Sequence, residues 1–150
     1  MSSGTLRFMA THSMLKPTRK HPDDAGIDLC TAVDVVVKPN STAIIPTGVY
    51  FDIPEGTMLM LKPKSRHDFL IGAGVIESGY QGEILVKIIN TSNENIQFAA
   101  GDQIAQAVHL PVLCYGLEEA ASLQDLFHVK SDRGATGGIV SQAGKRFGEV

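Results

Sequence analysis

Short polar segments that contain glycine interrupt the apolar stretches of this sequence, and they carry most of the side chains able to do chemistry. Five of them follow one another along the chain: 24–29, 63–65, 72–83, 101–106 and 133–138. They hold the carboxylates of Asp28 and Glu77, the cation and hydroxyl of Lys64 and Ser65, and the amide of Gln106. Groups of these types bind hydrated metal ions, transfer protons and hold anions. These segments are therefore the candidates for a functional site.

The histidines and cysteines do not indicate a metal centre. The five histidines lack the spacing of metal ligands, and we expect them to be structural or surface groups. Cys30 and Cys114 lie far apart and belong to no paired motif. This pattern favours free thiols in a reducing compartment over a disulfide or a zinc site.

The composition describes a folded protein of ordinary charge. The chain has 150 residues, 43% of them hydrophobic and 19% charged, which is typical of one globular domain. Lys and Arg number 13 against 16 Asp and Glu, a net charge of -3, so we expect no nucleic-acid partner. We find neither a signal peptide nor an apolar run of membrane-spanning length, and we expect no membrane partner. The predicted location is the cytoplasm, or also the nucleus if the source is a eukaryote or a virus.

Short apolar runs separated by Gly, Pro or Asn predict an all-β fold, either a sandwich or a barrel. The strongest predicted strand is 83–89, which the polar turn at 90–95 ends. Further strands are predicted at 5–10, 33–37, 43–45, 49–51, 58–61, 96–99 and 104–110. A single short helix is predicted within 116–124. From Ser131 onward the apolar pattern disappears, so we expect a tail that is disordered or ordered by contact with something else.

In their order, spacing and amino-acid sequences, the five polar segments resemble the five motifs of the trimeric dUTP diphosphatases, the dUTPases. The similarity runs from about Asp24 to Gly144, and GVIESGY and GDQIAQ carry most of it. It implies a jelly-roll-like distorted β-barrel (1–130) that forms a homotrimer, with active sites between subunits. It also implies a flexible glycine-rich arm (131–150) that closes as a lid over a neighbouring subunit's site.

The implied activity is hydrolysis of dUTP to dUMP and pyrophosphate, with Mg²⁺ on the triphosphate and a water attacking the α-phosphorus. Such an enzyme limits uracil incorporation into DNA and supplies dUMP for dTMP synthesis. By the same resemblance, Asp28 holds the metal through water, and Lys64, Ser65 and Gln106 contact the phosphates. Taken alone, Asp28 is also compatible with a solvated turn and Gln106 with a polar position on the barrel wall. Asp102 and Gln103 are expected to shape the turn and the subunit contact.

The third segment is expected to recognise the base and the sugar. The resemblance implies a hairpin whose backbone pairs with uracil, brought close by small residues, with the contacts made by Gly72, Ala73, Gly74 and Val75. It implies that Tyr80 lies under the deoxyribose, although an ordinary barrel aromatic is the alternative. Glu77 is implied to bind the 3′-OH and to orient the attacking water.

The fifth segment supplies the expected contacts of the arm. Arg133 is implied to clamp the terminal phosphate, with a solvent-exposed arginine as the alternative, and Gly137 and Gly138 complete the motif.

Several positions depart from the family pattern. Glu77 stands where the family has an aspartate, and Lys64 stands where it has an arginine. The second motif is shortened, and the phenylalanine that covers uracil is absent from the fifth. These departures leave two alternatives open: a catalytically weakened dUTPase-fold protein that acts by binding a protein partner, and a dCTP-processing relative on the same barrel.

Overall fold

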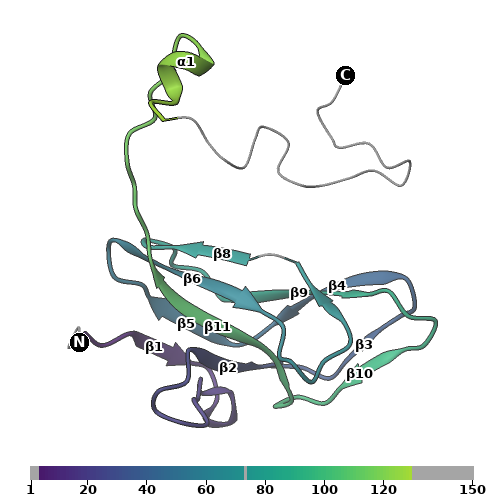
Figure 1. The fold of residues 1–150 in the computed structure, drawn as a ribbon. Helices are drawn as coiled ribbons and strands as arrows, with labels where there is room; N and C mark the ends of the chain where they lie inside the picture. The colour runs from purple at the N-terminus through teal and green to yellow at the C-terminus, as the bar shows by residue number, and fades with distance from the viewer. Residues whose placement is uncertain (1–3, 73, 130–150) are drawn as a thin grey trace. The chain divides into compact units, whose positions relative to one another are not determined.

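The computed structural model describes residues 4–72 and 74–129 (Figure 1). The chain divides into two units, of which the first ends at Cys114 and the second begins at Tyr115. The first unit contains the strands β1 to β11, and the second contains the helix α1 (Leu123–Leu126). Among these residues no helix is both long and apolar enough to cross a membrane. The domain boundary predicted at residue 130 stays a prediction.

The strands are short and evenly distributed along the first unit. In chain order they are β1 (Arg7–Ala10), β2 (Gly26–Cys30), β3 (Val35–Val37), β4 (Ser41–Pro46), β5 (Val49–Asp52), β6 (Thr57–Lys62), β7 (Leu70–Ile71), β8 (Gly74–Glu77), β9 (Leu85–Asn90), β10 (Ile96–Phe98) and β11 (Gln103–Pro111). A 3-10 turn, η1 (Ser13–Leu15), follows β1. The predicted all-β class is confirmed.

Two antiparallel sheets and two smaller ladders make up the fold. The order of the larger sheet is β2-β11-β6-β8, and that of the second sheet is β4-β9-β7. The strand pairs β1-β5 and β3-β10 form the ladders. Figure 1 shows β11 running beside β6 across the middle of this unit. This arrangement agrees with the jelly-roll-like barrel that we expected.

The core follows from the alternation of side chains along the strands. In β9, Val86 and Ile88 are fully buried while Lys87 is exposed, because successive side chains point to opposite faces of a sheet. Leu59 on β6 and Ile104 on β11 are equally buried. Each such side chain contributes about 1.5–3 kcal/mol relative to an exposed position.

Two of the observed strands that we had not predicted, β2 and β8, lie largely in segments that we had treated as polar motifs, and a third, β7, ends just before the third motif. The strand of the third motif, β8, pairs with β6, whereas β9 pairs with β4 and β7. Gly74 allows the close packing of β8, because a Cβ there would lie 3.0 Å from Leu61 Cδ1.

The helix α1 lies later in the chain than predicted. Ser122 is its N-cap, and its side chain accepts a hydrogen bond from the Asp125 N–H at 3.1 Å. This cap fixes the start at Leu123, near the end of the predicted range 116–124.

Candidate active site

Three segments far apart in the sequence meet in a cleft of about 690 Å³, which we call the basic cleft. The pairing of β11 with both β2 and β6 places Gln106 beside Asp28 on one side and Lys62 on the other. The chain then leaves β6 and brings Lys64 and Ser65 to the same cleft. The first, second and fourth motifs therefore form one site within a single chain.

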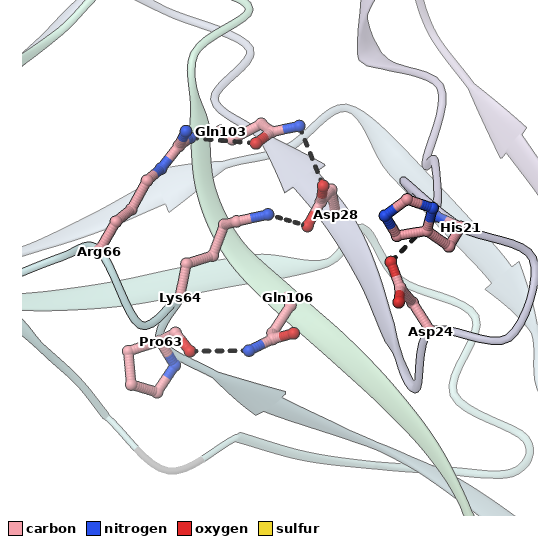
Figure 2. Close-up of polar contacts among 8 residues, drawn as sticks. All are labelled: His21, Asp24, Asp28, Pro63, Lys64, Arg66, Gln103 and Gln106. Carbon is pink, nitrogen blue, oxygen red and sulfur yellow. Dashed lines mark hydrogen bonds and ion pairs between the residues drawn. The ribbon is translucent and has the colours of Figure 1, made fainter.

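Asp28 is the best-anchored residue of the basic cleft. It lies on β2 and is only 8% exposed, so the solvated-turn alternative is wrong. One carboxylate oxygen forms an ion pair with Lys64 Nζ, and the other accepts a hydrogen bond from Gln103 Nε2 at 3.0 Å (Figure 2). Burying a carboxylate is costly unless a cation and hydrogen-bond donors satisfy it, and both are present here.

Gln103 and Arg66 were not among the predicted site residues. The ladder between β2 and β11 is irregular between Gln103 and Ala105, and at this bulge the Gln103 amide contacts Asp28. The Gln103 Oε1 accepts a hydrogen bond from Arg66 Nη2 at 3.0 Å. The expected turn role does hold for Asp102, whose carboxylate accepts from the Ala99 N–H at 2.8 Å. The sequence feature that could have indicated Arg66 as a site residue is its positive charge two positions after Lys64.

Gln106 lies beside Asp28 and makes a contact of its own. Its Nε2 donates to the backbone C=O of Pro63 at 2.9 Å, which ties β11 to the second motif. Gly26 on β2 leaves the room for this side chain, since a Cβ there would stand 2.9 Å from Gln106 Cδ. The half-buried amide lines the cleft, as a group that contacts an anion must.

The third motif lines a different cleft of about 610 Å³, which we call the β8 cleft. Its lining includes Gly74, Val75, Glu77 and Tyr80. Glu77 ends β8 with an exposed side chain, and the turn that follows is closed by the Tyr80 N–H donating to the Glu77 C=O at 3.2 Å. The carboxylate at position 77 therefore faces solvent at the edge of a hollow.

Tyr80 is 46% exposed and does not pack as a core aromatic. Its hydroxyl donates to the Glu83 C=O at 2.9 Å, and the ring lies so close to Gly82 that a Cβ there would stand 2.6 Å from Tyr80 Cζ. The carboxylate of Glu83 in turn accepts from the Gly48 N–H at 2.6 Å. These contacts hold the loop after β8 against the loop between β4 and β5.

The predicted site residues are thus divided between two clefts, whose described lining residues are all different. Asp28, Lys64, Ser65 and Gln106 line the basic cleft, and the third-motif residues line the β8 cleft. Gly72 lines neither, although its N–H donates to the Lys87 C=O at 2.9 Å. The remaining predicted residues lie outside the described part of the chain: Ala73, Arg133, Gly137 and Gly138.

The donor groups present restrict the kind of metal ion that could bind. Within residues 4–72 and 74–129 no three His, Cys, Asp or Glu side chains cluster as a metal cage. The basic cleft offers two carboxylates, those of Asp24 and the buried Asp28. This donor set fits a hard cation that keeps most of its waters and takes further oxygens from a ligand.

Two groups near the basic cleft have shifted pKa values. Burial raises the pKa of the Cys30 thiol, and the negative charges of Asp28 and Asp102 raise it further. Burial lowers the pKa of His67, and the positive charges of Arg66 and Lys64 add to this effect against the opposing charge of Asp68. The His67 ring stacks on Phe69 with centroids 4.5 Å apart, and its buried Nδ1 has no hydrogen-bond partner among the described residues.

The fold and the basic cleft define an all-β protein with a cleft lined by basic, carboxylate and amide side chains. The family model for dUTPase matches residues 13–137. The dUTPase of Leifsonia xyli is 35% identical over 136 residues, which cover 86% of this chain and 90% of that protein. The chain therefore belongs to the dUTPase family, as its motifs indicated.

Solved structures of phage dUTPases have the same fold. The dUTPase of Staphylococcus bacteriophage 80alpha with dUPNHPP has a TM-score of 0.77 at 26% identity, over 92% of this chain and all of that one. A mutant dUTPase from phage phi11 of S. aureus, which coordinates a structural Mg(II) ion, has a TM-score of 0.74 at 26% identity. That match covers 81% of this chain and 99% of the phage chain.

Proposed function

We propose that this protein hydrolyses dUTP to dUMP and pyrophosphate. The observation that carries the proposal is the basic cleft, where a buried carboxylate, a lysine and a glutamine from three motifs of the dUTPase family meet. A triphosphate repels an attacking water unless cations and hydrogen-bond donors surround it. The cleft supplies both.

In this proposal the basic cleft holds the phosphates. Lys64 contributes N–H donors, Ser65 a hydroxyl, and Gln106 an amide that exchanges its bond to Pro63 for a phosphate oxygen. Asp28 holds a hydrated Mg²⁺, which supplies charge neutralisation on the triphosphate when bound. The few carboxylates that line the cleft support a cation that keeps most of its waters, and the structural Mg(II) ion of the phi11 relative supports the choice of magnesium.

The β8 cleft would hold the nucleoside. Gly74 and Val75 expose backbone at its edge, where a uracil ring could pair with one N–H and one C=O. Cytosine would leave these partners unpaired, which is the physical basis for selecting uracil. Tyr80 would support the deoxyribose, and Glu77 would bind the 3′-OH and orient the attacking water.

A complete site requires more than one copy of the chain. The phosphate-binding residues and the nucleoside-binding residues line separate clefts, so we propose that neighbouring copies bring a basic cleft and a β8 cleft together. A homotrimer with the arm 131–150 closing over a neighbour's site satisfies this requirement. We also propose that the protein works in the cytoplasm, where its free thiols would remain reduced.

The substrate test measures pyrophosphate release by the purified protein with Mg²⁺. We expect dUTP to be hydrolysed far faster than dTTP, dCTP or UTP. Release no greater than a protein-free blank at millimolar dUTP would contradict the proposal and support the partner-binding alternative. Preferential hydrolysis of dCTP would support the alternative of a dCTP-processing relative.

Variants of Glu77 distinguish an effect on substrate binding from an effect on turnover. The variant Glu77→Gln keeps the size of the side chain and removes its charge, so we expect turnover to fall at least about 10²-fold while binding of α,β-imido-dUTP persists. Normal hydrolysis by this variant would show that another group positions the water. The conservative variant Glu77→Asp tests whether the backbone has adapted to glutamate. If dUTP turnover by this variant is slower than that of the natural protein, the backbone has adapted. If it is faster, the natural site is a weakened one.

A further inference from the structure

Lys64 is an incomplete anion-binding group in this structure. Its Nζ forms an ion pair with Asp28, and only 20% of its side chain is exposed. The ammonium therefore neutralises a buried carboxylate, and the pair as a whole offers little net charge to a polyanion. It also lacks the planar fork with which an arginine holds two phosphate oxygens at once.

Lys20 and Arg66 are further cations in the lining of the same cleft, and Arg66 is the one with a guanidinium. Its side chain is exposed and lines the basic cleft together with Lys64 and Ser65. In the described part of the chain, the bond from Nη2 to Gln103 Oε1 is its one side-chain hydrogen bond, and no carboxylate there forms an ion pair with it. A guanidinium has five N–H donors, so most of them remain available to a ligand.

Gln103 fixes the direction of that guanidinium. Its amide bridges two partners of opposite kind: Oε1 accepts from Arg66 at 3.0 Å, and Nε2 donates to Asp28 at 3.0 Å. The buried Asp28 anchors one end of this bridge, so Arg66 is connected to the strand β2 through a single side chain. If a long side chain is already ordered before the ligand binds, less conformational entropy is lost on binding. Figure 2 shows the whole chain of contacts, from Arg66 through Gln103 to Asp28.

We propose that Arg66 is a phosphate-binding residue of the basic cleft, and that Gln103 is the positioning residue that aims its guanidinium at the ligand. This inference rests on the proposed function only in its choice of ligand class, a nucleoside triphosphate. The guanidinium that Lys64 cannot supply is thereby provided two residues later, on the other side of Ser65. Gln103 acts through Arg66 and does not itself contact the substrate.

The test compares binding by calorimetry with two probes, inorganic tripolyphosphate and α,β-imido-dUTP, each with Mg²⁺. We expect Arg66→Gln to weaken the binding of both probes about tenfold, because it removes a charged hydrogen-bond donor. Its affinity should also depend less steeply on salt concentration, which a purely structural role would not change. Arg66→Lys should recover only part of the loss. The control is Arg7→Gln, which removes another exposed arginine, on β1 and outside the lining of the basic cleft, and should change neither affinity by more than about twofold.

The role of Gln103 is tested by a double-variant cycle. Gln103→Asn keeps the amide but is too short to reach both partners, so it should weaken tripolyphosphate binding in the natural background. In the Arg66→Gln background it should have no further effect. Additive losses would contradict the positioning role. Gln103→Leu repeats the measurement should the asparagine variant fail to fold.

Three results would overturn the assignment of Arg66: affinity of Arg66→Gln within about twofold of the natural protein, an equal loss in Arg7→Gln, or no binding of tripolyphosphate by the natural protein. Failure of the proposed function looks different. A protein that binds tripolyphosphate through Arg66 but releases no pyrophosphate from dUTP supports the present inference and contradicts the enzyme.

Discussion

Replacing Gly26 by alanine should disable the basic cleft while leaving the fold intact. The new Cβ would stand 2.9 Å from Gln106 Cδ and even closer to Gln106 Oε1, which a real Cβ cannot do. The obstructing atoms are the far end of a flexible side chain, so Gln106 can turn away without moving β2 or β11. The movement would break its bond to the Pro63 C=O and withdraw the amide from the phosphates.

The two effects differ in size. Loss of one neutral hydrogen bond at a partly exposed position costs about 1 kcal/mol, which lowers the melting temperature by about 3–4 °C in a domain of this length. Loss of a hydrogen bond to a charged phosphate costs about 1.5–3 kcal/mol in the transition state, so kcat/KM for dUTP should fall about 10- to 150-fold. We expect a large kinetic defect in a protein that still folds.

The assays are steady-state pyrophosphate release and thermal unfolding. Gly116→Ala is the control, since a Cβ there meets no atom within 4 Å. Adding Gln106→Ala to the Gly26→Ala protein should lower neither the melting temperature nor kcat/KM much further, because the bond to the Pro63 C=O and the contact to the phosphates are already lost. Natural kcat/KM in Gly26→Ala would refute the reasoning, and so would a melting temperature more than about 10 °C lower, since the backbone and not Gln106 would then have moved.

Two further predictions concern the shifted pKa values. The pKa of His67 is lowered in the folded protein, so below its ordinary value of about 6.5 the unfolded chain binds more protons, and stability falls as the pH drops through that value towards the folded pKa. Unfolding curves at pH 7.5 and 5.0 should therefore show a smaller acid destabilisation in His67→Phe than in the natural protein, and an equal one would contradict the assignment. For the thiols, burial and nearby carboxylates raise the pKa of Cys30, so iodoacetamide at pH 7.5 should alkylate the exposed Cys114 first, as peptide mass spectrometry can follow. Faster labelling of Cys30 would mean that β2 opens readily.

The sequence determined the class of fold and named four of the residues that line the basic cleft, Asp28, Lys64, Ser65 and Gln106. Alternating apolar runs such as the one that became β9 require a strand with one buried face, whatever lies next to it. The motifs identified the family, and they named Asp28, Lys64 and Gln106 before any geometry was known. A local pattern of apolar and polar residues indicates which side chains are buried and which backbone conformation they adopt. Both were predicted well where the pattern was long.

Only the tertiary structure decided which side chains meet. Period-two alternation does not say which strand will be the neighbour, so neither the pairing of β8 with β6 nor the bulge at Gln103 was visible in the sequence. The Gln103 contact to Asp28 joins residues 75 positions apart, and Arg66 joins this network from a third segment. The division of the site residues between two clefts is likewise a consequence of packing. Side-chain contacts across sheets depend on strand register and sheet twist, and these are determined by the packing of the whole chain.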